Sequence, residues 1–300
     1  MPVHEPSARP AGRARRSSCP VQLGPITDED AAEVAHFLQV HHNSRVPWLR
    51  AFSAVPWSVR APNHGFMLRD AGRVVGTLLA LYSERLVDGR MERFCNLGSW
   101  CVLPEYRSRS LALLEALLEQ EAYHFTVLSP NEDSQEILAW FKFRPLNCSA
   151  VVVPHFPLPT PLHRTVIVTY PPSINKLLRS TDLTLYRDHA RASAAHHLVI
   201  MRGGRTCYVM YRESRHTTGA RTAVLLHVSD PDLFHQEVIP LTRHLLLRHG
   251  LVATVADLQL IGHKPRLAIG TQRRPRMFRS ATLSPEQIDE LYSELVCIPL

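Results

Sequence analysis

Residues 102–114 (VLPEYRSRSLALL) combine the end of an apolar segment, a short basic loop and the start of a leucine-rich segment. The first backbone N–H groups of a helix have no acceptor within the helix, and the helix dipole is positive at that end. A helix that begins at Ser110 would therefore favour an anion such as a pyrophosphate, and Arg107 and Arg109 would add positive charge. The sequence predicts an anion site where a strand passes into a helix.

The segments around this loop alternate between the hydrophobic pattern of strands and that of helices. Turn signals at Ala71-Gly72 and Asp88-Gly89 separate three strand-like runs, whereas Leu111, Leu114 and Leu117 recur at the helical interval. The expected elements are strands at 65–69, 73–87 and 91–103, a helix at 110–121, a strand at 123–128 and a helix at 131–140. An earlier helix is expected to begin near Thr27, whose side chain can cap it.

The second half repeats this order of hairpin, strand, helix and strand without residue identity. Its expected elements are a strand at 165–169, a helix at 173–179, a hairpin of 197–201 with 206–212, a strand at 221–229, a helix at 231–249, a strand at 252–261 and an amphipathic helix at 288–295. Prolines between the halves predict a stiff connection. The expected organisation is a basic tail at 1–22, a first module at 23–153, a linker at 154–164 and a second module at 165–300.

The Arg107-x-x-Ser110-x-Ala112 pattern resembles the Arg/Gln-x-x-Gly-x-Gly/Ala signature of the Gcn5-related N-acetyltransferase superfamily. The order of elements is also similar, and so is the ending at Phe143-Arg144-Pro145. The resemblance covers residues 24–150, and it extends over 165–300 only as a pattern. It implies an α/β (α+β) fold of the acyl-CoA N-acyltransferase type, with a mixed, mostly antiparallel sheet flanked by helices, in two tandem modules of which the second is degenerate.

This resemblance implies an acyl-CoA-dependent N-acyltransferase that transfers an acetyl group from acetyl-CoA, or another acyl group, to an amine on a small molecule or a protein. By the same likeness, the general base is expected at Glu92, with Glu84 as second choice. Burial beside apolar groups would raise the pKa of such a carboxylate toward a useful value. The residues expected to bind the acyl-CoA are Trp100, Cys101, Val102, Arg107, Ser108, Arg109, Ser110, Leu111, Ala112 and Asn131.

The sequence departs from the family pattern at two positions. Ser110 replaces a glycine that lets the backbone approach the pyrophosphate. Leu138 stands where the family often has the tyrosine that protonates the leaving thiolate, and Tyr123 and Cys101 are nearby alternatives in the sequence. These departures leave open a second hypothesis, an inactive module that keeps the fold for ligand binding or protein interaction.

The basic residues outnumber the acidic ones by 34 to 27, and many lie between Lys264 and Arg279. That segment is interpreted as a solvated face or as part of a substrate cleft. Nucleic-acid binding is a third hypothesis, which no interleaving of aromatic and basic residues supports. The scattered cysteines and the His41-His42 and His196-His197 pairs have no ligand spacing, so no metal is expected. No apolar run is long enough for a membrane helix, and a cytoplasmic protein is expected.

Overall fold

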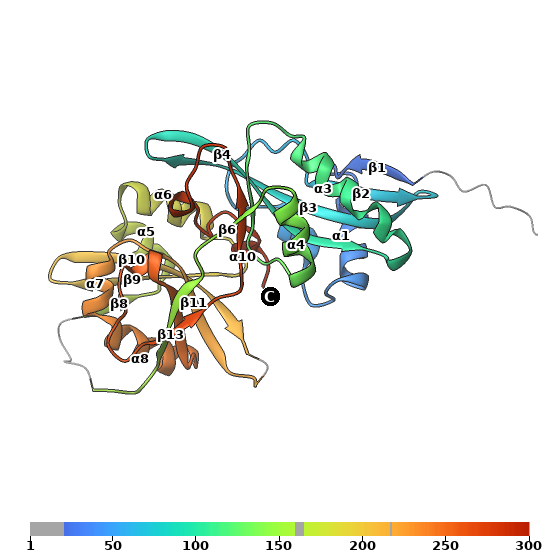
Figure 1. Cartoon of the computed structure of the whole chain (residues 1–300). Helices are drawn as coiled ribbons and strands as arrows, with labels where there is room; N and C mark the ends of the chain where they lie inside the picture. The colour runs from blue at the N-terminus through green and yellow to red at the C-terminus, as the bar shows by residue number, and fades with distance from the viewer. Residues whose placement is uncertain (1–20, 160–164, 217, 300) are drawn as a thin grey trace, which may run out of the picture.

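The computed structural model describes residues 21–159, 165–216 and 218–299, and it contains two seven-stranded sheets (Figure 1). Among the strand pairs described, those of β4 with β5 and of β11 with β12 are parallel, and the others are antiparallel. The expected mixed, mostly antiparallel sheets are confirmed. The first sheet has the order β1-β2-β3-β4-β5-β14-β6, formed by β1 (Gln22–Pro25), β2 (Gly65–Asp70), β3 (Arg73–Val87), β4 (Arg90–Val102), β5 (His124–Val127), β14 (Met277–Arg279) and β6 (Arg144–Pro145). The second has the order β13-β7-β12-β11-β10-β9-β8, formed by β13 (Ile269–Gln272), β7 (Ser149–Pro154), β12 (Ala253–Asp257), β11 (Arg221–Val228), β10 (Arg205–Arg215), β9 (Ala195–Arg202) and β8 (Val166–Val168).

Helices cover both faces of each sheet. They are α1 (Ala31–His41), α2 (Trp48–Ser53), η1 (Pro104–Arg109), α3 (Ser110–Leu118), α4 (Glu132–Trp140), α5 (Pro171–Leu177), α6 (Ser180–His189), α7 (Pro231–Gln236), α8 (Val238–His249), α9 (Leu258–Ile261), η2 (Pro285–Gln287) and α10 (Glu294–Cys297). Side chains of α3 and α4 pack on the first sheet, and those of α7 and α8 pack on the second. None of the helices described is long and apolar enough to cross a membrane.

The remaining faces of the two sheets share one apolar core. Phe37 of α1 and Trp57 belong to the same buried cluster as Tyr186 of α6 and Met210 of β10. Removal of apolar surface from water is the main stabilising contribution to a fold. The two halves are therefore stabilised together rather than as modules held only by their linker.

Each half also contributes one strand to the other half's sheet. β7 precedes the proline-rich segment but lies between β12 and β13, whereas β14, near the C-terminus, lies between β5 and β6. The module expected at 23–153 thus includes a strand whose hydrogen bonds belong to the second sheet. A short apolar run predicts a buried strand but does not indicate which sheet the strand joins.

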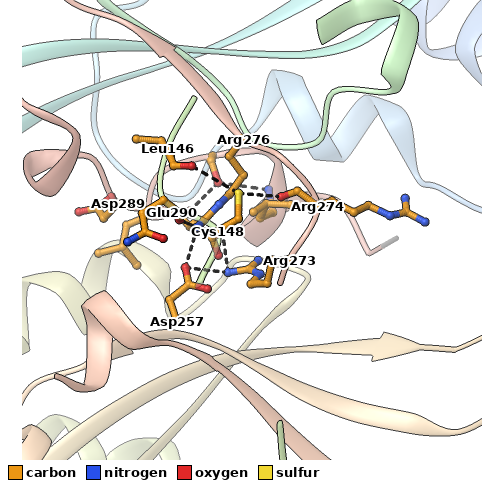
Figure 2. Close-up of polar contacts among 12 residues, drawn as sticks. Leu146, Cys148, Asp257, Arg273, Arg274, Arg276, Asp289 and Glu290 are labelled. Atoms are coloured by element: carbon orange, nitrogen blue, oxygen red, sulfur yellow. Dashed lines mark hydrogen bonds and ion pairs between the residues drawn. The ribbon is translucent and has the colours of Figure 1, made fainter. Parts of the chain in front are cut away.

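A buried ion-pair cluster lies where the two exchanged segments pass each other (Figure 2). Nη1 of Arg276 lies 2.6 Å from a carboxylate oxygen of Asp257 and 2.6 Å from one of Glu290, and Arg273 pairs with the same two acids. Nη2 of Arg276 donates to the carbonyl of Asn147 at 2.6 Å, just before β7. Two arginines of the basic 264–279 segment therefore neutralise buried acids, so the interpretation of the whole segment as a solvated face was wrong.

The amphipathic helix expected at 288–295 is absent from the described C-terminal segment, in which α10 begins only at Glu294. Both kinds of side chain in this stretch are buried: Leu291 packs in the shared core, and Glu290 pairs with the arginine cluster. An amphipathic helix keeps its acidic face in solvent, so it could not bury Glu290 together with Leu291. Tertiary contacts with buried partners therefore overrode the helical pattern.

Three further expectations differ in their boundaries. The helix expected at 231–249 is split into α7 and α8 at Glu237, and the strand expected at 252–261 ends at Asp257, where α9 follows. Thr27 does not cap the first helix, because its amide and hydroxyl both donate to Asp30, at 2.9 and 2.7 Å, and α1 begins after Asp30.

Candidate functional site

A cavity opens where β4 and β5 separate. The two strands pair only from Phe94–His124 to Asn96–Thr126, and β4 then continues to Val102 without β5 beside it. The gap between them holds a cavity of about 370 Å³, lined by residues 97–100 of β4, 129–131 after β5, and side chains from α4 and the C-terminal segment. Parallel strands that part in this way expose backbone groups, which a ligand can use.

A β-bulge turns the β4 wall toward the cavity. In the pairing with β3, Leu79 faces Gly98 and Thr77 faces Cys101, so β4 contains one extra residue over this interval. The bulge includes Ser99, which adopts a φ of 51°. A residue other than glycine in this region is strained by roughly 1–3 kcal/mol, and such strain is often found at functional sites.

Glu294 is the ionisable group deepest in the cavity wall. It is 1% exposed, and its Oε1 accepts a hydrogen bond from Ser129 Oγ at 3.0 Å. Its backbone N–H donates to Asn96 Oδ1 at 2.8 Å, at the last paired position of β4 and β5. Burial raises the pKa of Glu294 to about 7. The carboxylate is thus held at the point of separation and can exchange a proton near neutral pH.

Two polar atoms beside the cavity have no partner among the residues described. They are Oε2 of Glu294 and Nε1 of Trp100, both buried, on residues that line the cavity. Buried polar atoms are nearly always hydrogen-bonded in folded proteins. One acceptor and one donor in the lining of the same cavity indicate that a polar ligand or ordered water completes this site.

The expected cofactor loop forms a short helix rather than the short basic loop that the sequence predicted. Residues 104–109 form the short 3₁₀ helix η1, in which the amide of Tyr106 donates to the carbonyl of Leu103 at 2.9 Å, and the amide of Ser110 donates to the carbonyl of Arg107. Arg107, Ser108 and Arg109 are exposed and do not line the cavity. The basic charge is present, but one of the amides expected to bind phosphate, that of Ser110, already has an acceptor.

The other expected cofactor residues divide into two groups. Trp100 and Asn131 line the cavity, and Asn131 also caps α4, where its Oδ1 accepts from the amide of Ser134 at 2.8 Å. The thiol of Cys101 faces the carbonyl of His41 instead, and burial raises its pKa. Val102, Leu111 and Ala112 were also expected at the cofactor, but they do not line the described cavity.

The two carboxylates expected as the base lie away from the cavity. Glu92 Oε2 lies 2.9 Å from Nε2 of His124, and Glu84 forms an ion pair with Arg93 at 3.2 Å. Neither belongs to the cavity lining. Leu138 does line it, so the position at which the family resemblance places a proton-donating tyrosine carries an apolar side chain.

Sequence reasoning missed Glu294 and Ser129. A weak signal existed, because Glu294 is an isolated acid in the apolar run from Leu291 to Ile298. The run was interpreted as a packing helix, and nothing in its spacing connects it with a residue 165 positions earlier.

In the second half, acidic residues line the cavity beside the parallel strands β11 and β12. A cavity of about 210 Å³ lies beside β11 and β12, and its lining includes Asp257 and Glu290 of the ion-pair cluster. Asp230 stands between β11 and α7, where it caps the helix by accepting from the amide of Leu233 at 2.9 Å. A phosphate at this helix end would meet a carboxylate, so the described second half offers no equivalent of the basic loop.

Comparison with known proteins finds similarity in structure and not in sequence. No protein-family model matches the chain, and no curated protein matches it. A Gcn5-related N-acetyltransferase from Anabaena variabilis covers 87% of this chain and 72% of its own, at 13% identity and a TM-score of 0.56. A probable N-acyltransferase from Enterococcus faecalis gives the same coverage and identity with a TM-score of 0.58.

An N-myristoyltransferase from Saccharomyces cerevisiae, solved with bound myristoyl-CoA and inhibitors, covers 98% of this chain and 89% of its own, at 10% identity and a TM-score of 0.51. That match extends over both sheets. These similarities identify the fold as that of the Gcn5-related N-acetyltransferases.

Proposed function

We propose that this protein is an acyl-CoA-dependent N-acyltransferase, which transfers an acetyl group from acetyl-CoA to an amine in the cavity between β4 and β5. The observation that carries this proposal is Glu294, a buried carboxylate with a pKa near 7 and an unpartnered oxygen in the cavity wall of the described chain. Glu294 takes the role that the sequence assigned to Glu92 or Glu84.

The proposed reaction is a direct attack on the thioester. The amine nitrogen forms a bond to the thioester carbonyl carbon, the C–S bond breaks, and Glu294 accepts the proton that the amine loses. Because Leu138 cannot supply a proton, the same proton returns from Glu294 to the leaving sulfur or passes to water. Ser129 holds the carboxylate and Asn96 holds the backbone N–H of Glu294, so much of the acceleration comes from positioning.

A base in this position predicts a defined pH profile. Glu294 must be deprotonated to accept a proton, so kcat/KM rises as pH increases through about 7 and then levels off. Glu294→Gln should lower kcat by roughly 10²- to 10⁴-fold and remove this limb. Release of free thiol from acetyl-CoA in the presence of amines is the measurement, and Glu119→Gln, on the surface of the first half, is the matched control.

One observation favours the second hypothesis, an inactive module that binds a ligand. The amide of Ser110, which was expected to bind the pyrophosphate, donates to the carbonyl of Arg107 instead, and this disfavours a pyrophosphate held by that amide. Calorimetric titration with acetyl-CoA tests this point. Binding without thiol release for any amine would support the inactive module, and no binding at millimolar coenzyme A would overturn the transferase proposal.

A further inference from the structure

The cavity wall carries one arginine whose charge is not neutralised within the described chain. Arg274 lines the cavity, its side chain is exposed, and it belongs to none of the ion pairs among the described residues. In Figure 2 its side chain extends away from the cluster around Arg276. Glu294 is the only carboxylate of the described lining, and its Oε1 accepts a hydrogen bond from Ser129.

The backbone that carries Arg274 is held on both sides. Its neighbour Arg273 pairs with Asp257 and Glu290, and Arg276 pairs with the same acids. The thiol of Cys148 also contacts the carbonyl of Arg274 at 3.6 Å. The ion-paired Arg273 and Arg276 thus flank Arg274 on the chain, and the backbone that they fix presents the guanidinium of Arg274 to the cavity.

Arg274 lies on the opposite side of the cavity from the basic loop. β4 forms one wall and leads into η1 with its exposed arginines, whereas Arg274 precedes β14, which pairs with β5 on the other side of the gap. A coenzyme A whose phosphates meet the exposed side chains of Arg107 and Arg109 on η1 would leave Arg274 facing the second substrate. A guanidinium binds a carboxylate through paired hydrogen bonds and is well suited to this anion.

We propose that Arg274 binds a carboxylate of the acceptor, so that the acylated amine belongs to an amino acid or a similarly small amino-carboxylate. The proposal rests on the proposed function, because it assigns the second substrate of the same cavity. The cavity of about 370 Å³ suits such a molecule, since ligand pockets span roughly 300–1,000 Å³. The amine then lies toward Glu294 and the carboxylate toward Arg274.

The test compares amino acids with their own carboxamides as acceptors at saturating acetyl-CoA, with thiol release as the readout. The acids should be better substrates than the amides. Arg274→Ala should lower kcat/KM for the acids by about 10- to 100-fold, the range for loss of a charge-assisted hydrogen bond, and should leave the amides unchanged. Arg274→Lys should retain part of the preference.

Arg266→Ala is the matched control, because it removes an exposed arginine of the same basic segment that does not line the cavity. It should leave acids and amides unaffected. Calorimetric titration of Arg274→Ala with coenzyme A shows whether Arg274 binds a phosphate of the cofactor or the carboxylate of the acceptor. Wild-type affinity is expected if the carboxylate belongs to the acceptor.

Three outcomes would overturn the inference. If the enzyme uses amino acids and their carboxamides equally well and still releases thiol, this inference is rejected and the transferase proposal stands. Weakened coenzyme A binding by Arg274→Ala, with no change in acceptor preference, would assign the arginine to a phosphate of the cofactor. Absence of both coenzyme A binding and thiol release would reject the proposed function and this inference with it.

Discussion

Glu294 concentrates the chemistry of the candidate site in one side chain, and its burial has a consequence for stability. Its pKa is raised from 4.5 to about 7, chiefly by burial. Between these values the folded protein keeps a proton that the unfolded chain releases. The contribution of Glu294 to stability is therefore intact below pH 4.5 and is lost as pH rises through 7, at roughly 3 kcal/mol in total.

Glu294→Gln should therefore stabilise the protein at high pH. The amide oxygen can still accept from Ser129, and no charge is buried. We expect the free energy of unfolding to rise by up to about 3 kcal/mol at pH 8.5 and to change little at pH 4.5. Urea unfolding at the two pH values measures the difference. An equal effect at both would show that the titration of Glu294 does not influence stability, and Glu119→Gln serves again as the surface control.

At the scale of single elements, the bulge in β4 shapes the cavity. An uninterrupted strand would alternate side chains between the two faces, whereas the extra residue at the bulge lets residues 97–100 line the cavity together. The φ of 51° at Ser99 is the conformation that makes this possible. The strain is confined to one residue, which makes it accessible to a single substitution.

Ser99→Gly should raise the free energy of unfolding by about 0.5–1 kcal/mol, because glycine adopts this φ without strain and loses only part of the gain to backbone entropy. Ser108→Gly is the matched control. Ser108 lies in η1 and is not among the described residues with positive φ, so the same substitution should lower stability by about 0.5–1 kcal/mol. Urea unfolding of both variants gives the signs, and a loss with Ser99→Gly would contradict the strain argument.

At the scale of the whole molecule, the exchange of β7 and β14 and the shared core join the halves into one unit. Arg276 lies at the crossing, 6% exposed, with Asp257, Glu290 and the carbonyl of Asn147 around it. Removing one partner of a buried ion pair leaves charge without compensation, which is strongly destabilising. The stability of both sheets is therefore expected to depend on this cluster.

Wild-type protein should unfold in a single cooperative transition. Arg276→Ala should lower the free energy of unfolding by about 3–5 kcal/mol, and the variant should still unfold in one transition. Arg274→Ala, in the same segment but exposed, should leave stability within about 0.5 kcal/mol of the wild type. Calorimetry and urea unfolding followed by two spectroscopic probes test both statements. Two separate transitions in the wild type would indicate that the halves fold independently.

Local patterns were sufficient for most elements of the first half. Turn signals at Ala71-Gly72 and Asp88-Gly89 and the leucine spacing after Ser110 predicted β2, β3, β4 and α3 close to their observed bounds. The expected Trp100 and Asn131 also lie in the cavity. The strand and helix predictions succeeded because turns and amphipathic periods depend on residues adjacent in the chain, whereas the cofactor role of Trp100 and Asn131 stays a prediction.

The tertiary structure alone decided the site's carboxylate and the partners of the exchanged strands. Glu294 meets Ser129 and Asn96 only because β14 brings the C-terminal segment to the first sheet. The sequence by itself determined the elements whose turns and periodicity are local, such as β2, β3, β4 and α3. Which distant segments touch depends on burial of whole faces, and that information is spread over the entire chain rather than held in any one stretch.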